Sequence, residues 1–406
     1  MNIESYIREK AVSSRAAADA LALMSTEEKN AQLLAMADAL ERAYDEIVAA
    51  NAEDVEKARD AHLAPSLVDR LTLTKERFDA MVEGVRHVAT LPDPVGAELS
   101  KCIRPSGIAI RKVRVPIGVI AVVFESRPNV FVDTAALCLK SGDAVILRGG
   151  KEAFKTNSAL AKCVRASLSV PDAVEFIDIT EHEAVSALVR CTGLVDLAIP
   201  RGGERLVRAM CEAALVPVLK HYKGVCHVYV DDKADFGMAL SILDNAKTQR
   251  PGVCNAAECL LVNESIAPMF MPMVKAWADD KGVILHGPAK AGDGSVDWEH
   301  EFLALEMNVG TVANCAEAVS HINRYGSHHS DCIVTSDSAA ASHFLKSVDS
   351  AAVYHNVSTR FTDGSEFGMG AEIGISTDKL HARGPMGLEE LTTYKYEVTG
   401  DGVIRR

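Results

Sequence analysis

The 406-residue chain has few aromatic side chains and too little positive charge to balance its acids. Phe, Trp and Tyr make up 5% of it, and 56 acidic residues against 43 basic ones give a formal net charge of −13. Base stacking needs aromatic rings, and binding a polyanion needs clustered cations. General nucleic-acid binding is therefore excluded, although a local basic pocket for one small anion remains compatible with the charge.

Long apolar runs and metal-type cysteine spacings are missing too. The longest apolar runs, such as residues 119–124, are too short to span a bilayer, and the N-terminal MNIESYIREK contains no apolar signal core. We therefore expect a cytoplasmic protein without a membrane partner. The ten cysteines include no CxxC pair, and no HExxH string occurs. Unclustered thiols suit a reducing compartment, and we expect no metal site.

The length predicts two or three domains, and the hydrophobic pattern predicts their class. Residues 1–91 are helical in pattern, with an apolar stripe over 33–47 and a capping box at Ser25 and Glu28. From residue 119 onward, short apolar runs alternate with helical stretches, which indicates βαβ units and parallel sheets. We expect strands within 119–124, 144–147, 174–177, 194–199, 225–230, 256–262, 303–309 and 331–335.

Two segments distant in sequence, 107–114 and 392–404, alternate like half-exposed strands. Such strands often form sheet edges that pair with another subunit. A solvent-facing hairpin would produce the same alternation, so the pattern alone leaves both interpretations open.

Glycine pairs flanked by cations follow two of the expected strands, at residues 148–151 and 201–203. Loops at the carboxyl ends of parallel strands bind phosphates, because glycine permits close backbone approach and a cation supplies charge. Arg201, Gly202 and Gly203 are thus candidates for a dinucleotide cofactor, and Arg148 with Lys151 favours NADP over NAD. Neither loop matches the Rossmann or P-loop fingerprint, and each could be a plain turn.

The segment 249–259 has the most reactive local sequence. Pro and Gly break the preceding helix just before Cys254, where free backbone N–H groups and Arg250 would lower the thiol pKa and favour a nucleophile. The amide of Asn255 or Asn129 could complete an oxyanion hole. The alternative is that Cys254 is a buried core residue, as Cys259 is expected to be.

Other polar residues are candidates for substrate contacts. His328 and His329 lie in a loop before an expected strand and offer at most one substrate donor, since adjacent side chains diverge. Arg360 stands in a long glycine-rich stretch and is a candidate clamp for an anionic group, as is Arg127. An isolated surface arginine would have no such role.

Five strings together resemble the gamma-glutamyl phosphate reductases, also called glutamate-5-semialdehyde dehydrogenases, and more distantly the aldehyde dehydrogenase superfamily. They are VFESRPNVFVD (123–133), LRGGKEA (147–153), RPGVCNAAE (250–258), HINRYGSHHS (321–330) and STRFTDGSEFGMGAEIGISTDKLHARGPMGLEELTTYKY (358–396). They follow the family's order over most of the chain.

The resemblance implies an aldehyde-dehydrogenase-like α/β fold with a Rossmann-type cofactor domain, an α/β catalytic domain and a small β arm. The corresponding boundaries are 1–100 with 119–224 for the NADP-binding domain, 225–385 for the catalytic domain, and 101–118 with 386–406 for the oligomerisation arm. A homo-oligomer, dimer or tetramer, is expected from this arm.

The resemblance also implies residue roles. Cys254 falls at the nucleophile and Asn129 at the oxyanion amide, while Lys151 and Glu301 fall where the superfamily contacts the adenosine and nicotinamide riboses. Arg127, Asn255, His329 and Arg360 are expected substrate contacts. Where hydrolytic relatives keep a Glu-Leu-Gly-Gly string to activate water, residues 221–224 read His-Tyr-Lys-Gly.

The implied reaction is the NADPH-dependent reduction of L-glutamyl 5-phosphate to L-glutamate 5-semialdehyde and phosphate. It would pass through a cysteine thioacyl intermediate and form the second step of L-proline biosynthesis. Without a water-activating glutamate, that thioester should resist hydrolysis. Two alternatives remain: a reductive relative acting on an acyl-CoA, and a catalytically silent scaffold.

Overall fold

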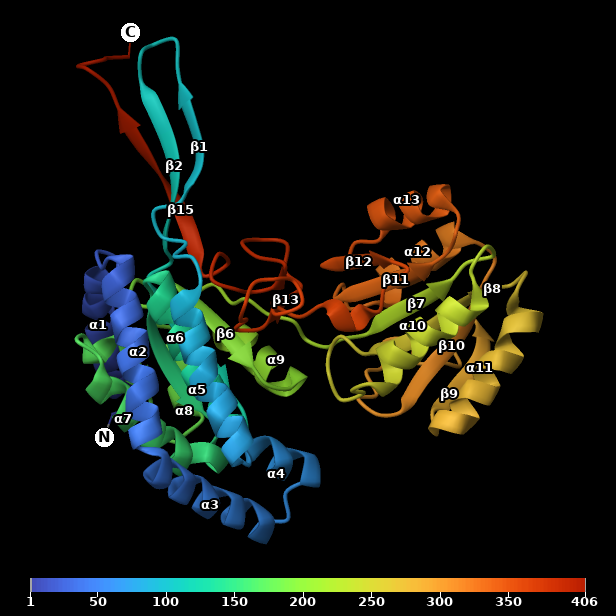
Figure 1. Ribbon diagram of the computed structural model, residues 1–406, viewed down its shortest axis with the longest axis horizontal. Coiled ribbons are helices and arrows are strands. Elements are labelled where there is room, and N and C mark those ends of the chain that lie inside the picture. The colour runs from blue at the N-terminus through green and yellow to red at the C-terminus, as the bar shows by residue number, and fades with distance from the viewer. Residues whose placement is uncertain (1, 406) are drawn as a thin grey trace. The chain divides into compact units, whose positions relative to one another are not determined.

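The computed structural model describes residues 2–405, and the chain divides into two compact units. Unit 1 comprises Met1–Lys220, Gly368–Gly374 and Met386–Arg406, and unit 2 comprises His221–Phe367 and Ile375–Pro385. Unit 1 therefore holds both ends of the chain (Figure 1). No helix among the described residues is long and apolar enough to cross a membrane.

Five helices open unit 1, and the predicted capping box begins the second. The Glu28 backbone N–H donates to Ser25 Oγ at 3.2 Å and the Ser25 N–H donates to Glu28 Oε2 at 2.8 Å. The apolar stripe is divided at Ala43, which caps the end of one helix and the start of the next. The helices are α1 (Ile3–Leu21), α2 (Thr26–Arg42), α3 (Tyr44–Asp60), α4 (Pro65–Leu71) and α5 (Lys75–Thr90).

A four-stranded parallel sheet of order β5-β4-β3-β6 forms the core of unit 1. Its central strands are buried along their whole length, which explains their unbroken apolar runs. The order reverses between β3 and β6, so the loops after these two strands meet at a topological switch point. The elements are β3 (Val119–Phe124), α6 (Pro128–Ser141), β4 (Ala144–Gly149), α7 (Phe154–Ser167), β5 (Val174–Phe176), α8 (Glu183–Leu188), β6 (Leu197–Arg201) and α9 (Glu204–Ala213).

A separate three-stranded antiparallel sheet of order β1-β2-β15 belongs to unit 1 as well. Its strands are β1 (Glu98–Ile103), β2 (Ala109–Pro116) and β15 (Thr392–Thr399). The two segments predicted as half-exposed strands thus pair with each other, with Thr392 opposite Pro116. In Figure 1 this sheet extends away from the helices of unit 1 as a long ribbon.

Unit 2 contains a six-stranded sheet of order β12-β11-β7-β8-β10-β9, in which every neighbouring pair is parallel. Alternate residues of its strands enter two cores: one includes Val228 and Phe270, and the other includes Tyr229 and Phe344. The strands are β7 (Cys226–Val230), β8 (Ala257–Asn263), β9 (Ile284–Lys290), β10 (Glu306–Val312), β11 (Ser330–Val334) and β12 (Ala352–His355), and the helices α10 (Phe236–Thr248), α11 (Ala267–Lys281), α12 (Cys315–Tyr325) and α13 (Ser338–Ser347).

Candidate functional site

Cys254 lies in a turn between α10 and β8, at the amino end of the strand. Its side chain is half-buried, and its backbone oxygen accepts a hydrogen bond from Cys226 Sγ at 3.2 Å. Gly224 packs so closely against this turn that a Cβ there would stand 1.8 Å from the Cys254 oxygen. The thiol is therefore partly open to solvent while the backbone beneath it is held firmly.

Asn255 and Arg360 fasten this turn to the segment that follows β12. Arg360 Nη1 donates to Asn255 Oδ1, and Asn255 Nδ2 donates to the Thr362 oxygen at 2.9 Å. Arg360 Nε also reaches Gln249 Oε1 at 2.9 Å. Burial, with Arg250 nearby, lowers the pKa of the Arg360 guanidinium. Both ends of the Asn255 amide are thus engaged inside the protein, so this side chain holds the turn in place.

His329 is fully buried at the amino end of β11, one strand away from β8 across β7. Its Nδ1 lies 2.9 Å from Ser330 Oγ and 3.8 Å from Cys226 Sγ. Because Cys226 also donates to the Cys254 oxygen, His329 contacts the cysteine turn indirectly, through Cys226.

Glu301 and Glu258 connect the loop before β10 to the same edge of the sheet. Glu301 Oε1 accepts from the Gly224 N–H at 2.7 Å, and Glu258 Oε1 accepts from the Leu303 N–H at 3.3 Å. Glu258 is fully buried and pairs with Lys247 at 2.8 Å, and burial raises the pKa of Glu258 to about 7. The segments that precede β7, β8, β10 and β11 therefore converge at the amino ends of the strands.

A pocket of about 580 Å³ opens beside Arg360. Its wall combines the carboxylates of Asp363 and Glu366 with the amides of Asn245 and Gln249. Since Gln249 and Arg360 hydrogen-bond to each other, the pocket shares a wall with the cysteine turn. Met238, Ile242, Val357 and Phe361 complete the wall, so the cavity is mixed polar and apolar, and its size suits a small metabolite.

In unit 1, Asn129 is exposed in the first turn of α6, and Arg127 is the N-cap residue of this helix. Asn129 Nδ2 donates to Asp133 Oδ2 at 2.9 Å, one helical turn further on. Removal from water raises the pKa of Asp133 to about 6. The amide is thus oriented by a neighbouring carboxyl group at the positive end of a helix dipole.

The loops after β3 and β6 in unit 1 bind carboxylate oxygens, and the loop after β6 is one of the two predicted cofactor loops. The Gly203 N–H donates to Glu125 Oε2 at 2.9 Å, and both the N–H and the hydroxyl of Ser126 donate to Glu152 Oε1, at 2.8 and 2.6 Å. Arg201 Nε is buried and has no hydrogen-bond partner within residues 2–405. Donors that bind carboxylates at a switch point fit the phosphates of a dinucleotide equally well.

The two cations expected beside these loops differ in exposure. Lys151 is exposed at the start of a short 3₁₀ helix, Lys151–Ala153. Arg148 is buried and donates to the Gly149 and Thr180 oxygens at 3.1 and 2.9 Å. Burial lowers the pKa of Arg148. Lys151 is therefore the member of this pair that can meet a ligand from solution.

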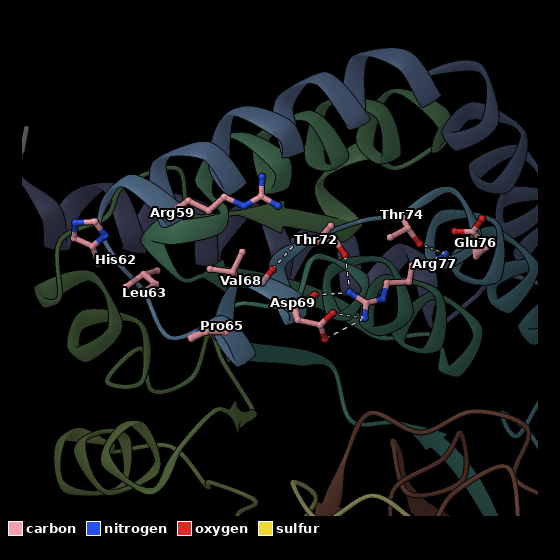
Figure 2. A pocket seen from close by; sticks show the side chains of 10 residues that line it. All are labelled: Arg59, His62, Leu63, Pro65, Val68, Asp69, Thr72, Thr74, Glu76 and Arg77. Atoms are coloured by element: carbon pink, nitrogen blue, oxygen red, sulfur yellow. Dashed lines mark hydrogen bonds and ion pairs between the residues drawn. The ribbon is translucent and has the colours of Figure 1, made fainter.

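Another pocket, of about 940 Å³, lies in unit 1 among α3, α4 and α5, and no residue predicted for the site lines it. Figure 2 shows Arg77 in its wall, donating to Asp69 Oδ1 at 2.9 Å and to the Thr72 oxygen at 2.9 Å. Its polar groups thus bind one another, and Arg59 and His62 lie further along the wall.

Comparison with known proteins gives a consistent result. The aldehyde dehydrogenase family model matches residues 4–283. The gamma-glutamyl phosphate reductase of Thermodesulfovibrio yellowstonii is 49% identical, with all of both chains covered, and that of Carboxydothermus hydrogenoformans is 50% identical over 95% of this chain and 96% of its own.

Solved structures agree with these relatives. The gamma-glutamyl phosphate reductase of Thermotoga maritima matches with a TM-score of 0.95 and 43% identity, over 98% of this chain and 100% of the other. An acetylating aldehyde dehydrogenase from Geobacillus thermoglucosidasius, 15% identical, shares the fold with a TM-score of 0.70 over 100% and 98% of the two chains. The aldehyde-dehydrogenase-like α/β fold is confirmed, and the chain belongs to the gamma-glutamyl phosphate reductases of the aldehyde dehydrogenase family.

Proposed function

We propose that this enzyme reduces L-glutamyl 5-phosphate to L-glutamate 5-semialdehyde and phosphate in proline biosynthesis, with Cys254 as nucleophile. The observation that carries the proposal is the half-buried Cys254 thiol, held on a turn that Gly224, Cys226 and Asn255 fix from several sides. A nucleophile that forms a covalent intermediate must be accessible and rigidly positioned.

The first step uses groups of this chain only. The Cys254 thiolate attacks the acyl carbon, the negative charge moves to the acyl oxygen, and its return expels phosphate as the thioester forms. Backbone N–H groups of the cysteine turn and the Asn129 amide would stabilise that oxyanion. Asp133 accepts from Asn129, and this contact orients the amide.

A reduced nicotinamide cofactor, which we take to be NADPH, supplies hydride to the thioester when bound. Gly202, Gly203 and Arg201 would hold its phosphates, and Lys151 and Glu301 its two riboses. The support is that the Gly203 N–H binds a carboxylate and that Arg201 Nε is buried without a partner among the described residues. Cys254 sulfur leaves as the thiolate when the aldehyde is released.

The thioester must be shielded from water after phosphate is released, because hydrolysis would otherwise compete with its reduction. Segment 221–224 contains no carboxylate: His221 Nδ1 lies 2.9 Å from the Ile375 oxygen and Lys223 donates to the Glu299 oxygen at 2.6 Å. The carboxylate base that hydrolytic relatives keep in this string is thus missing.

For the substrate itself, we propose that Arg360 and Arg127 provide positive charge for its anionic groups. Asn255 and His329, which we expected to touch substrate, are proposed to position the cysteine turn, because one is engaged at both ends of its amide and the other is fully buried.

We further propose that residues 1–100 and 119–224 form the NADP-binding domain, 225–385 the catalytic domain, and 101–118 with 386–406 an oligomerisation arm. The arm is supported by its two edge strands, β1 and β15, and by exposed apolar side chains on them. A dimer or tetramer of identical chains follows.

The test is the substitution Cys254→Ser, assayed as NADP⁺ reduction by glutamate semialdehyde and phosphate. We expect the rate to fall by about 10³-fold or more, because a serine hydroxyl is far less nucleophilic than a thiolate. Cys163→Ser changes an equally half-buried thiol of α7 and should keep the rate. Persistence of activity in Cys254→Ser would refute the nucleophile, and activity with coenzyme A in place of phosphate would point to an acyl-CoA enzyme.

A further inference from the structure

Three buried side chains of unit 2 that the proposed reaction does not use come together within its sheet. They are His227 of β7, Cys259 of β8 and His321 of α12, with exposed fractions of 0%, 0% and 5%. Each can offer one ligand atom such that all three atoms lie within 4.8 Å of one another.

Both ring nitrogens of His321 lack the hydrogen bonds that burial demands, with no partner among the described residues. His227 and Cys259 lie close enough to hydrogen-bond to each other. The surroundings offer aromatic faces instead: the rings of Trp298 and Tyr325 each lie 4.8 Å from the His321 ring, centroid to centroid. Unpaired buried polar atoms are rare and costly, and they often mark an ion that the side chains were built to bind.

The other ring nitrogen of His227 is held by a carboxylate. His227 Nδ1 lies 3.0 Å from Asp331 Oδ1, which also accepts the His227 backbone N–H at 2.8 Å. Asp331 Oδ2 is fixed in turn by the Ser350 hydroxyl at 2.5 Å. A carboxylate that accepts a hydrogen bond from the Nδ1–H group favours the tautomer with a lone pair on Nε2, and this is how metal-binding histidines are usually oriented.

We propose that His227, Cys259 and His321 form a buried structural site for a thiophilic metal ion, with Zn²⁺ as the ion it fits. Two imidazoles and a thiolate are typical zinc ligands. Bond lengths of roughly 2.0–2.3 Å place tetrahedral ligand atoms about 3.3–3.7 Å apart, so an inward movement of about 1 Å suffices. Cys259 binds as the thiolate, and its proton passes to solvent as the sulfur–metal bond forms.

Such an ion would join β7, β8 and α12. It would thus link the strand that follows the cysteine turn to its neighbouring strand and to a helix. The three side chains leave one position of a tetrahedral ion for a water molecule, and the ion would take no part in the reaction. The proposal stands independently of the reductase activity.

The test uses the full-length protein, freed of metal with a chelator and titrated with Zn²⁺ against a chromophoric chelator, and separately with Co²⁺. We expect one ion per chain and a thiolate-to-Co²⁺ charge-transfer band. Cys259→Ser should weaken Zn²⁺ binding about 100-fold and abolish the band. Cys332→Ser, an equally buried thiol on the adjacent β11, and Cys254→Ser should retain both.

Circular dichroism establishes that each variant is folded, and His321→Gln provides a second route to the same loss of affinity. Failure of the unmodified protein to bind Zn²⁺ or Co²⁺ stoichiometrically would overturn the proposal, as would undiminished binding by folded Cys259→Ser and His321→Gln. The three side chains would then be an ordinary buried contact between a thiol and two imidazoles. Loss of binding in Cys254→Ser alone would overturn it too, by assigning the ion to the catalytic thiol.

Discussion

At the residue scale, the cysteine turn depends on a half-buried arginine, Arg360, that a sequence pattern would assign to substrate alone. Arg360 bridges Gln249 and Asn255 with different nitrogens of one planar guanidinium. A lysine carries the same charge but lacks the fork that makes two directed bonds. Arg360 therefore has a positioning role in addition to any contact with an anion.

We predict that Arg360→Lys lowers kcat/KM about 10- to 100-fold, because the turn loses one charged hydrogen bond worth about 1.5–3 kcal/mol. Part of the loss should appear in kcat, since the thiol itself becomes less well placed. Steady-state kinetics measures both parameters. Arg86→Lys, which alters a surface ion-pair network of α5, serves as the control, and equal effects of the two variants would contradict the prediction.

The carboxyl group beside Asn129 makes stability depend on pH. Burial raises the pKa of Asp133 to about 6, above its unfolded value of about 3.9, so the native state binds the extra proton between these two values. The contribution of protonated Asp133 to the free energy of unfolding is therefore full below about pH 4 and is lost as the pH rises through 6.

We therefore predict that the free energy of unfolding falls between pH 4 and 6 in the unmodified protein relative to Asp133→Asn, by up to about 3 kcal/mol. Urea denaturation at several pH values measures the difference. Asp232→Asn, at an exposed position, should follow the unmodified protein, and parallel curves for all three proteins would show that Asp133 does not titrate in this range.

At the scale of elements, the clearest local signal is the capping box of α2. Ser25 and Glu28 satisfy each other's backbone N–H groups, which otherwise lack partners at a helix start. We predict that Ser25→Ala lowers the free energy of unfolding by about 1 kcal/mol. Ser13→Ala, inside α1, should leave it unchanged or slightly raised, because alanine favours a helix interior. Urea denaturation compares the two.

Several strands that the sequence pattern did not predict are short or little buried. β9 is exposed over much of its length and contains Pro288, which marks an edge strand and weakens any strand signal. β1 is exposed throughout, and β12 has only four residues. Buried strands such as β3 and β8 were predicted because burial on both faces leaves an apolar run in the sequence.

The cysteine turn and the proposed metal site also differ in how much of each could be predicted from the sequence. Cys254 and Asn255 are adjacent, and the string around them marked the turn, but the contact with Arg360 joins residues far apart and appears only in the fold. His227, Cys259 and His321 lie on three separate elements, so no ligand spacing exists to be recognised, and the sequence pattern led us to expect no metal site.

At the scale of the whole molecule, the three-stranded arm has two open edges. Ile103 on β1 and Tyr396 and Val398 on β15 are exposed by 73%, 60% and 55%. Exposed apolar side chains on unpaired edges are typical of a surface that another chain covers.

We predict that Tyr396→Asp shifts the protein from a dimer or tetramer toward monomer, because a charge in an apolar contact is not compensated. Light scattering coupled to size-exclusion chromatography measures the mass. Leu345→Asp, at an exposed apolar position of α13, makes the same charge change on another element and should leave the mass unaltered. A monomeric unmodified protein, or an unchanged mass in Tyr396→Asp, would contradict the proposed arm.

The pairing of β2 with β15 has a consequence for the order of events during synthesis. β2 emerges from the ribosome early, but its partner begins at Thr392, near the end of the chain. At about 5–20 residues per second, β2 waits on the order of 15–60 seconds for that strand. The main segment of unit 2, His221–Phe367, is translated within this interval and is free to fold before β15 pairs with β2. The three-stranded sheet is therefore completed only after the main segment of unit 2 has been translated.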